Sequence, residues 1–389
     1  MDRDRYSYIY ILNTHSSGVI QKIRHQLLSA ESIKLKMDWY VFGDESVRQS
    51  LSDLMNLKRL NFQLLPEVSS NFGRLLRRLF KYRLVDRVVP WHLYKATVIR
   101  YAWSIDPYAP IFFWRRGRML FTEHNTLELN ELSKMNYFGK LGPLLGFLES
   151  VISPVTLSQV RGSIAVTSEI AIDLKKRCGV RSTRVIANGI STAECYQRFF
   201  SYSQKEIEFL FLSSTFEKHH GLDLLLHSLE RYSGDIPIKL HIVGNLIEPL
   251  VDLRLPTNVS LKIHGHLRKE AIKDLFNRVN LAFGSLALTR YGMQDACTLK
   301  SREYIAHGVP IAYAYKDPDL QPDLPFVLQM ETSEESYDIQ KIVDFVHSLG
   351  DQKGLSEIMY KFSQDKLDWE VKLEQLIEYL RSETISEQL

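Results

Sequence analysis

Short apolar runs, rich in β-branched and aromatic residues, alternate along this chain with stretches whose apolar residues recur at helical spacing. Alternation of this kind predicts parallel sheets covered by helices, and therefore an α/β fold. The first run, residues 6–12, predicts a strand, and the polar turn behind it ends at Gly18, before a helix from about Val19. The other predicted strands are residues 36–42, 109–114, 119–122, 163–167 and 184–187 in the first half, and 207–212, 239–243, 260–263, 281–283 and 309–314 in the second.

A polar stretch in the middle of the chain separates these two series of strands. Asn188 and Gly189 end the strand at 184–187, and mostly polar residues then lead to the next strand. Two α/β domains of similar size joined by a linker predict a ligand cleft between them. We therefore assign residues 1–190 to one domain and residues 191–364 to the other.

The last part of the chain has a helical pattern of its own. Between residues 365 and 381, apolar side chains recur at the spacing of one helix face. We expect residues 365–389 to include an amphipathic helix that packs back on the first domain.

Composition narrows the class of protein. The chain has 389 residues, of which 45% are hydrophobic and 24% charged, and this excludes a wholly disordered protein. Its 49 basic and 46 acidic residues give a net charge of +3, which does not suggest a dedicated nucleic-acid binder. Three cysteines without CxxC spacing exclude a disulfide scaffold and a cysteine zinc site, and they fit a reducing, cytoplasmic compartment. We expect neither a signal peptide nor a transmembrane helix, because no apolar run is long enough.

The densest group of chemically useful residues lies between residues 286 and 310. Gly292 permits a sharp turn after the strand at 281–283, and a helical pattern runs from about Thr298 to Gly308. A loop that enters a helix in this way exposes backbone N–H groups to an anion such as phosphate. Two acids eight residues apart, Asp295 and Glu303, flank the basic Lys300.

This group resembles the donor motif of retaining GT-B glycosyltransferases of family 4. The acidic pair, the following Tyr304 and the Gly-x-Pro at 308–310 are similar to that motif, in which Glu usually stands at the position of Asp295. Further segments resemble the same family in order and spacing. They are residues 13–19, 122–125, 166–168, 185–190, 211–223, 240–244 and 263–266.

The resemblance implies a GT-B fold, in which two Rossmann-like α/β domains face a central cleft. It implies an acceptor-binding domain at 1–190 and a nucleotide-sugar-binding domain at 191–364. The expected reaction moves a hexose, with retention, from a UDP- or GDP-sugar to a glycan or lipid-linked acceptor in bacterial surface polysaccharide biosynthesis. No metal or cofactor is required, because the nucleotide-sugar is a substrate and its leaving phosphate takes the proton from the acceptor.

The resemblance also assigns roles to residues. Glu303 would accept hydrogen bonds from the ribose hydroxyls, and Asp295 would hold hydroxyls of the transferred sugar. Lys300 would stabilise charge on the leaving diphosphate. His124, at the end of a strand, would face the acceptor, so the expected catalytic residues are His124, Asp295 and Lys300. The expected donor-binding residues are Gly18, Thr215, Lys218, His220, Gly265, Arg290, Gly292, Met293, Gln294, Asp295, Leu299, Lys300 and Glu303.

One departure from the family pattern leaves two alternatives open. Family members commonly carry Arg and Lys in the loop after the first strand of the second domain, where this chain has Thr215 and His220. Lys218, His219 and Arg290 are nearby candidates for the phosphate-binding charge. The alternatives are a catalytically inactive GT-B-shaped protein that binds a nucleotide-sugar or a partner, and a nucleotide-sugar epimerase.

A basic segment explains where the small positive charge is concentrated. Between residues 74 and 95 there are seven bases and one acid, and Arg74, Arg77, Arg78 and Lys81 share one helical face. One interpretation is a surface helix that packs on the first domain. The other is an amphipathic helix held on an anionic membrane surface, where each base adds about 1 kcal/mol. Arg115, Arg116 and Arg118 lie in the same half and favour a peripheral position on the inner face of the cell membrane.

Overall fold

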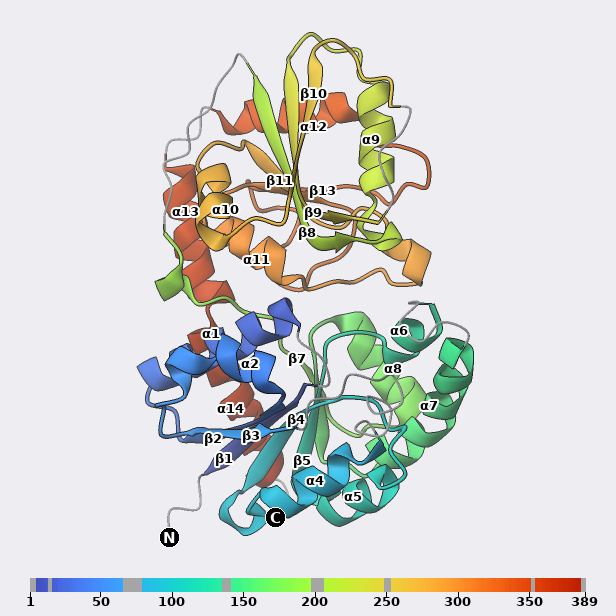
Figure 1. Cartoon of the computed structure of the whole chain (residues 1–389), viewed down its shortest axis with the longest axis vertical. Coiled ribbons are helices and arrows are strands. Elements are labelled where there is room, and N and C mark those ends of the chain that lie inside the picture. Colours follow the sequence, from blue (N-terminus) through green and yellow to red (C-terminus); the bar gives the residue numbers. More distant parts are fainter. Residues whose placement is uncertain are drawn as a thin grey trace. The chain divides into compact units, whose positions relative to one another are not determined.

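A computed structural model describes residues 5–12, 16–65, 79–134, 141–196, 206–247, 253–350 and 354–385. The chain folds into two compact units (Figure 1). Unit 1 consists of Met1–Ser191 and Trp369–Leu389, and unit 2 consists of Thr192–Asp368. Each unit is built around its own parallel sheet, so the α/β class predicted from the sequence is confirmed.

Unit 1 contains a seven-stranded sheet in the order β3-β2-β1-β4-β5-β6-β7, in which all paired strands are parallel. The order reverses direction at β1, and this is the topology of a doubly wound, Rossmann-like fold. Its elements are β1 (Tyr6–Ile11), α1 (Ser17–Ser32), β2 (Met37–Gly43), α2 (Glu45–Ser50), η1 (Ser52–Leu54), β3 (Leu60–Leu64), α4 (Lys81–Val88), η2 (Trp91–Leu93), β4 (Ala96–Arg100), α5 (Ala109–Arg116), η3 (Gly117–Met119), β5 (Leu120–His124), α6 (Glu128–Lys134), α7 (Gly142–Leu157), β6 (Gly162–Ala165), α8 (Ser168–Cys178), β7 (Thr183–Val185) and α14 (Trp369–Ile385).

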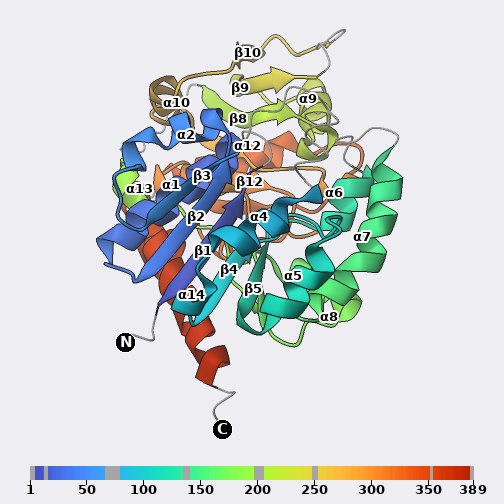
Figure 2. The same ribbon diagram turned by 60° about the horizontal axis from the view of Figure 1, so that its bottom comes forward.

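The core of unit 1 is aromatic and includes the last helix of the chain. The rings of Tyr8 and Tyr10 on β1 stack on each other and on Trp39 of β2, with centroids 4.8 to 6.4 Å apart. From α14, Trp369 and Leu373 enter the same buried cluster. The red helix α14 therefore lies beside α1 and completes unit 1, as Figures 1 and 2 show.

Unit 2 repeats this topology with six strands in the order β10-β9-β8-β11-β12-β13, again parallel throughout. Here the order reverses at β8, so β8 and β11 flank the point of reversal. Its elements are η5 (Thr192–Glu194), β8 (Ile207–Phe216), η6 (Lys218–His220), α9 (Leu222–Glu230), β9 (Ile238–Leu246), β10 (Val259–Gly265), α10 (Lys269–Phe276), β11 (Leu281–Phe283), η7 (Leu288–Tyr291), α11 (Leu299–Ala306), β12 (Ile311–Tyr313), β13 (Val327–Gln329), α12 (Ile339–Leu349), α13 (Leu355–Phe362) and the π-helical turn η8 (Ser363–Leu367).

One predicted strand, residues 109–114, was wrong, because this segment is helix α5. Pro110 stands in the first turn, where a helix tolerates the missing N–H, whereas a strand would lose a ladder hydrogen bond there. Phe112 and Phe113 are both buried, whereas Ile111 and Trp114 on either side are exposed, which is a helical and not an alternating pattern. The short strands β3, β4 and β13 were not predicted at all.

The basic segment at residues 74–95 does not form the predicted exposed basic face at the one position of that face that the structure describes. Arg74, Arg77 and Arg78 lie outside the described residues. Lys81 is buried at the start of α4, where its ammonium donates hydrogen bonds to the carbonyl oxygens of Ala102 and Trp103. The assignment of Lys81 to an exposed basic face is therefore wrong, because its charge is used inside unit 1.

Two searches of the described residues bear on partners. No helix among them is long and apolar enough to cross a membrane. No group of three or more His, Cys, Asp or Glu side chains among them has the arrangement of a metal site.

Candidate functional site

In unit 2, the candidate site is formed by loops that follow β8 and β11. In doubly wound sheets, ligands bind beyond the carboxyl ends of the strands at the point where the strand order reverses. The loop after β8 runs through η6 to Gly221, and the loop after β11 runs through η7 to the start of α11. Backbone hydrogen bonds join the two loops, from the N–H of Leu286 to the carbonyl of His220 and from Ala287 to His219.

His220 organises the loop after β8. Its Nδ1 accepts a hydrogen bond from the N–H of Glu217 at 3.0 Å, so the proton resides on Nε2, which lies 3.2 Å from Ser213 Oγ. That hydroxyl in turn donates to the carbonyl of Thr215 at 2.8 Å. Burial, with the nearby charge of Lys300, lowers the pKa of His220 far below its usual range. His220 is thus a neutral residue that shapes the loop, and it supplies no positive charge.

His219 is neutral for the same reason. Its ring contacts those of His220 and Tyr291 in tilted arrangements, at centroid distances of 4.0 and 4.7 Å. Burial, with a smaller contribution from Lys300, lowers the pKa of His219 to about 4. Neither histidine therefore replaces the cation expected at this loop.

Arg290 and Lys218 are the remaining basic candidates beside these loops. The Arg290 guanidinium donates to both carboxylate oxygens of Asp223, at 2.9 and 2.8 Å, and to the carbonyl of Lys218 at 2.9 Å. This bidentate pair ties η7 to α9 and directs the charge of Arg290 to a carboxylate. The Lys218 side chain is exposed to solvent.

Lys300 lies in the first turn of α11 and reaches back to β8. Its ammonium donates to the carbonyl of Leu212 at 3.2 Å and lies 5.0 Å from the centre of the Phe211 ring. Burial lowers the pKa of Lys300 to about 7. The same turn is capped by Thr298, whose hydroxyl accepts from the N–H of Ser301, and it begins with the half-buried Leu299. A titratable cation thus stands beside the N-terminus of a helix, a suitable place for an anion.

Glu303 lies one turn further along α11. Its carboxylate is half-buried, and within the described part of the chain no hydrogen bond or salt bridge reaches it. Burial raises the pKa of Glu303, although the charges of Lys269 and Lys273 on α10 oppose the shift. An unpaired, partly buried carboxylate is costly unless a ligand supplies donors to it.

The segment 292–295 leads from η7 to this helix. Gly292 has a left-handed backbone, with φ of +67°, and ends η7. The N–H of Met293 donates to the carbonyl of Leu288, and the carbonyl of Gln294 accepts from the N–H of Lys316. The half-buried Asp295 forms a β-bridge with Lys316. These bonds fix the path of the loop in front of α11.

Arg302 is a structural residue of α11 that the sequence analysis did not single out. Its guanidinium is completely buried and binds the carboxylate of Asp317, with a second contact to Asp319 at 3.2 Å. The ion pair attaches α11 to the loop after β12 and so sets the position of Lys300 and Glu303. No pattern in the sequence marked Arg302 as a buried residue.

Thr215 and Gly265 lie at the ends of neighbouring strands. Thr215 pairs with Asn245 beyond a bulge in β8, and Gly265 ends β10 with φ of +64°. The bulge requires Gly244 on β9, because a Cβ atom there would lie 1.6 Å from the carbonyl oxygen of Ser213. The backbone geometry of these strand ends therefore depends on glycine at position 244.

The two candidates in unit 1 are less favourable. Gly18 is half-buried in the first turn of α1. His124 has no exposed surface, and its ring nitrogens lie 2.7 Å from Glu128 Oε1 and 2.9 Å from Thr122 Oγ1. The centroid of the imidazole ring also lies 4.7 Å from the centroid of the Tyr101 ring. Because both nitrogens are engaged inside unit 1, the structure does not favour His124 as a residue that touches an acceptor.

A buried polar cluster beside His124 was not predicted from the sequence. The ammonium of Lys22 on α1 donates to Glu123, Asn125 and Asn188 at 2.7 to 2.8 Å and lies 5.4 Å from the Trp369 ring. The signal in the sequence was weak, since Lys22, Gln26 and Ser29 fall on the buried face of the predicted helix. The cluster connects α1, β5, the chain after β7 and α14.

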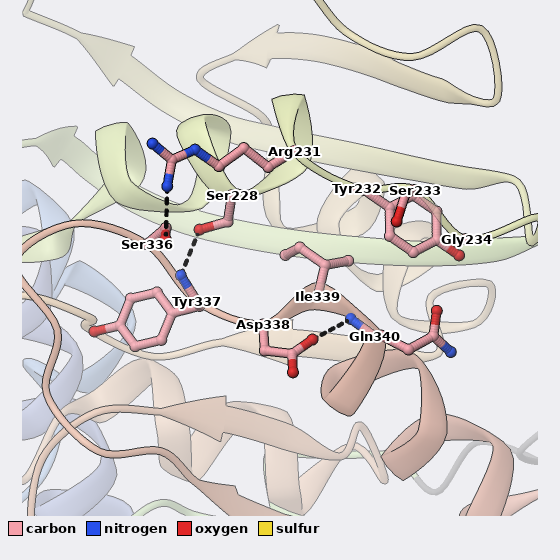
Figure 3. Close-up of a pocket in the computed structure, with 10 residues that line it drawn as sticks. All are labelled: Ser228, Arg231, Tyr232, Ser233, Gly234, Ser336, Tyr337, Asp338, Ile339 and Gln340. Atoms are coloured by element: carbon pink, nitrogen blue, oxygen red, sulfur yellow. Dashed lines mark hydrogen bonds between the residues drawn. The ribbon is translucent and has the colours of Figure 1, made fainter.

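A polar cavity of about 370 Å³ lies elsewhere in unit 2, where the chain after α9 faces the start of α12 (Figure 3). Hydrogen bonds from the N–H of Tyr337 to Ser228 Oγ and from Arg231 to Ser336 cross it. Asp338 on its rim caps α12. None of the residues that the sequence predicted for the site lines this cavity.

Comparison with known proteins gives information on the fold. No family model matches the chain, and no curated protein matches it in sequence. Solved structures do match. A glycosyltransferase from Rickettsia africae has a TM-score of 0.63 at 11% identity, with 98% of this chain and 99% of that chain covered. Anabaena HepE in complex with UDP and glucose has a TM-score of 0.61 at 14% identity, with coverage of 98% and 100%.

A third match is the pneumococcal O-GlcNAc transferase GtfA in complex with UDP and GlcNAc. It has a TM-score of 0.56 at 8% identity, with coverage of 98% and 99%. The chain has the GT-B glycosyltransferase fold. At these identities the likeness establishes the fold, so the function has to be argued from the site.

Proposed function

We propose that this chain is a glycosyltransferase that moves a hexose from a nucleotide-sugar donor, a UDP-sugar or GDP-sugar, to a glycan or lipid-linked acceptor. We propose further that the reaction retains anomeric configuration, requires no metal ion, and serves bacterial surface polysaccharide synthesis. Two Rossmann-like units with the GT-B fold support the reaction class.

One observation carries the proposal. On α11, beside the point where the strand order of unit 2 reverses, the unpaired carboxylate of Glu303 and the cation of Lys300 stand one turn apart. A nucleoside diphosphate offers the matching chemistry, with vicinal ribose hydroxyls as donors and a diphosphate as the anion. Met293, Gln294 and Asp295 precede this helix, and their backbone and carboxylate would hold the sugar.

The chemistry that follows from this arrangement is electrostatic. Lys300 and the N-terminus of α11 stabilise the negative charge that grows on the leaving diphosphate, and one well-placed donor is worth about 2.7–4 kcal/mol. In the retaining reaction, the acceptor oxygen attacks the anomeric carbon on the face from which the phosphate departs. A phosphate oxygen takes the acceptor proton, and the products are a glycoside and a nucleoside diphosphate.

The matched structures guide the choice of ligands. HepE was solved with UDP and glucose, and GtfA with UDP and GlcNAc, so we propose uridine as the first donor base to test. A lipopolysaccharide outer core galactosyltransferase, WaaB, matches with a TM-score of 0.54 at 13% identity. It supports a surface polysaccharide or its lipid-linked precursor as the acceptor.

The test compares Glu303→Gln with Glu357→Gln, an exposed glutamate on α13 that serves as the matched control. Thermal shift with UDP, GDP, ADP and their sugars identifies the donor for the unaltered chain. Glu303→Gln should weaken the binding of that donor by at least about tenfold, because an amide cannot accept hydrogen bonds from both hydroxyls as a carboxylate does. The control should bind as the unaltered chain does. Equal donor binding by Glu303→Gln would exclude this site.

Turnover separates the alternatives. Release of nucleoside diphosphate that depends on an acceptor, with the product anomer assigned by NMR, is the expected result. Donor binding without release for any glycan or lipid-linked acceptor would favour a binding protein, and a changed sugar nucleotide without acceptor would favour an epimerase. Retained activity in a chelator supports a metal-independent reaction, and lost activity that Mn²⁺ restores would contradict it.

A further inference from the structure

Helix α7 of unit 1 turns its polar side inward. The face that packs on unit 1 carries small and polar residues beside the buried Leu157, and the one charged residue of the helix, Glu149, has no exposed surface. The buried residues of α7 are Gly142, Gly146, Glu149, Ser153, Thr156 and Leu157. An ordinary surface helix of a globular protein has the opposite arrangement, with apolar residues toward the core.

Hydrogen bonds fix this orientation. Glu149 accepts from the hydroxyl of Tyr101 and from the N–H of Ser104 at 2.7 Å. Thr156 Oγ1 lies 2.6 Å from Ser104 Oγ, and Arg177 on α8 donates to Ser153 Oγ at 2.6 Å. Rotating the helix to bury its apolar side would leave these buried polar groups without partners, at about 1–3 kcal/mol for each group.

The outward face of α7 is an exposed apolar stripe. Leu141, Leu144, Phe147, Val151 and Val155 follow one another at intervals of three and four residues, and each is between 55% and 64% exposed. At 1.5 Å per residue the stripe is about 21 Å long. No charged side chain interrupts it. A continuous apolar surface of this length, held outward by buried polar bonds, indicates a binding surface.

The neighbouring helices add the residues that a membrane interface prefers. Helix α5 packs beside α7 in unit 1 (Figure 1). Trp114 of α5 is 75% exposed, and Ile111 and the Phe80 next to α4 are half exposed. Tryptophan with basic residues around an apolar surface is typical of the bilayer interface.

Helices α4 and α5 and the turn η3 carry a net positive charge. In α4, α5 and η3 the exposed bases are Arg83, Arg87, Arg115 and Arg118. The one acid of these elements, Asp86, is already paired with Arg115 and Arg116, at 3.0 and 2.7 Å. An anionic lipid headgroup region complements such a surface, whereas the same face of a second copy would repel it.

We propose that the apolar stripe of α7, with Trp114 of α5 and the arginines of α4 and α5, is a docking surface for an anionic lipid bilayer. The surface differs from the one predicted from the sequence, since Lys81 is buried and Arg74, Arg77 and Arg78 lie outside the described residues. It does not depend on the proposed donor chemistry, because none of these residues belongs to the candidate site in unit 2.

The test is flotation of the whole chain with vesicles of phosphatidylcholine, with and without phosphatidylglycerol. We expect binding to the phosphatidylglycerol vesicles that weakens as salt is added. The triple variant Phe147→Gln/Val151→Gln/Val155→Gln should lower the partition coefficient by about tenfold or more. The triple variant Arg83→Gln/Arg87→Gln/Arg118→Gln should lower it by a similar factor and remove most of the salt dependence.

Matched controls replace as many exposed residues elsewhere. Leu64→Gln/Ile247→Gln/Ile358→Gln removes three apolar side chains of similar exposure, and Lys262→Gln/Lys341→Gln/Lys361→Gln removes three exposed cations. Both controls should bind vesicles as the unaltered chain does, and every variant should bind the donor equally well.

Two outcomes would overturn the proposal. One is equal vesicle binding by the α7 variant and the unaltered chain. The other is absence of vesicle binding combined with a dimer, by analytical ultracentrifugation, that the α7 variant converts to a monomer. The second result would assign the stripe to a contact between two copies of the chain. Loss of donor binding in all variants alike would concern the proposed function and not this surface.

Discussion

The ammonium of Lys22 lies 2.7 Å from Glu123 Oε1, and both side chains are about 95% buried. Asn125 and Asn188 accept the other hydrogen bonds of the ammonium. The pair and its asparagine partners join α1 to the inner strand β5 and to the segments that follow β5 and β7. Unit 1 therefore depends on one fully satisfied buried ion pair.

Breaking the Lys22–Glu123 pair from one side should destabilise unit 1 strongly. Lys22→Met leaves an uncompensated carboxylate inside the unit, at a cost of about 3–5 kcal/mol. Lys22→Met/Glu123→Leu removes both charges and should recover most of that loss. Urea unfolding followed by circular dichroism measures the difference, and a single variant as stable as the double variant would contradict the prediction.

The same pair predicts a dependence of stability on pH. Burial alone would raise the pKa of Glu123, but the charge and hydrogen bond of Lys22 outweigh it, so the pKa is lowered from its usual value. A lowered carboxyl pKa contributes stability above the unfolded-state pKa and loses it as pH falls through the folded-state value. Melting temperatures from neutral pH to pH 3 should therefore fall more steeply for the unaltered chain than for Lys22→Met/Glu123→Leu. Parallel curves would show that the pair makes no such contribution.

Donor binding should be coupled to protonation of Lys300. Burial lowers the pKa of this ammonium to about 7, and a bound diphosphate would raise it again because the anion favours the charged form. Binding then takes up part of a proton at neutral pH, and affinity falls as pH rises above about 7. A UDP-sugar itself carries no group that titrates in this range.

Calorimetry in two buffers of different ionisation enthalpy measures this proton uptake directly. The matched variant is Lys300→Arg, whose guanidinium stays charged, so its affinity should change little between pH 6.5 and 8.5. Identical apparent enthalpies in both buffers for the unaltered chain would show that Lys300 does not titrate on binding.

Gly244 should be the least replaceable glycine at the strand ends of unit 2. A Cβ atom there would overlap the carbonyl oxygen of Ser213 at 1.6 Å, in a backbone with φ of +128°. Gly244→Ala should cost about 3 kcal/mol or more and should weaken donor binding, because it displaces the β8 bulge. Gly265→Ala is the control, since its Cβ would meet open space and only the left-handed backbone costs roughly 1–2 kcal/mol. Equal unfolding midpoints for the two variants would contradict the argument.

Local patterns were sufficient for the parallel α/β architecture and for α11. The apolar runs of β1, β2, β8, β9 and β11 form buried strands, and each run can be recognised from its own local sequence. Gly308 follows α11 closely, as glycine does at helix ends. Segment 109–114 was wrongly predicted as a strand because its aromatic residues suit a strand. Pro110 and the packing of Phe112 and Phe113 favour a helix instead.

What the sequence could not predict depends on partners that are distant along the chain. Lys22 is buried because Glu123 lies beside it, 101 residues later. The outward apolar face of α7 likewise follows from Tyr101, Ser104 and Arg177, which come from other elements.

The discontinuity of unit 1 has a consequence for synthesis on the ribosome. Trp369 and Leu373 of α14 belong to the buried cluster formed by β1, β2 and α1, but they are translated only after the whole of unit 2. The first 191 residues therefore emerge with an unfilled hydrophobic groove on their sheet. Unit 2 can fold cotranslationally as a continuous segment, whereas unit 1 closes only once α14 has left the exit tunnel. A truncation before Trp369 should consequently spare unit 2 and leave unit 1 a substrate for chaperones.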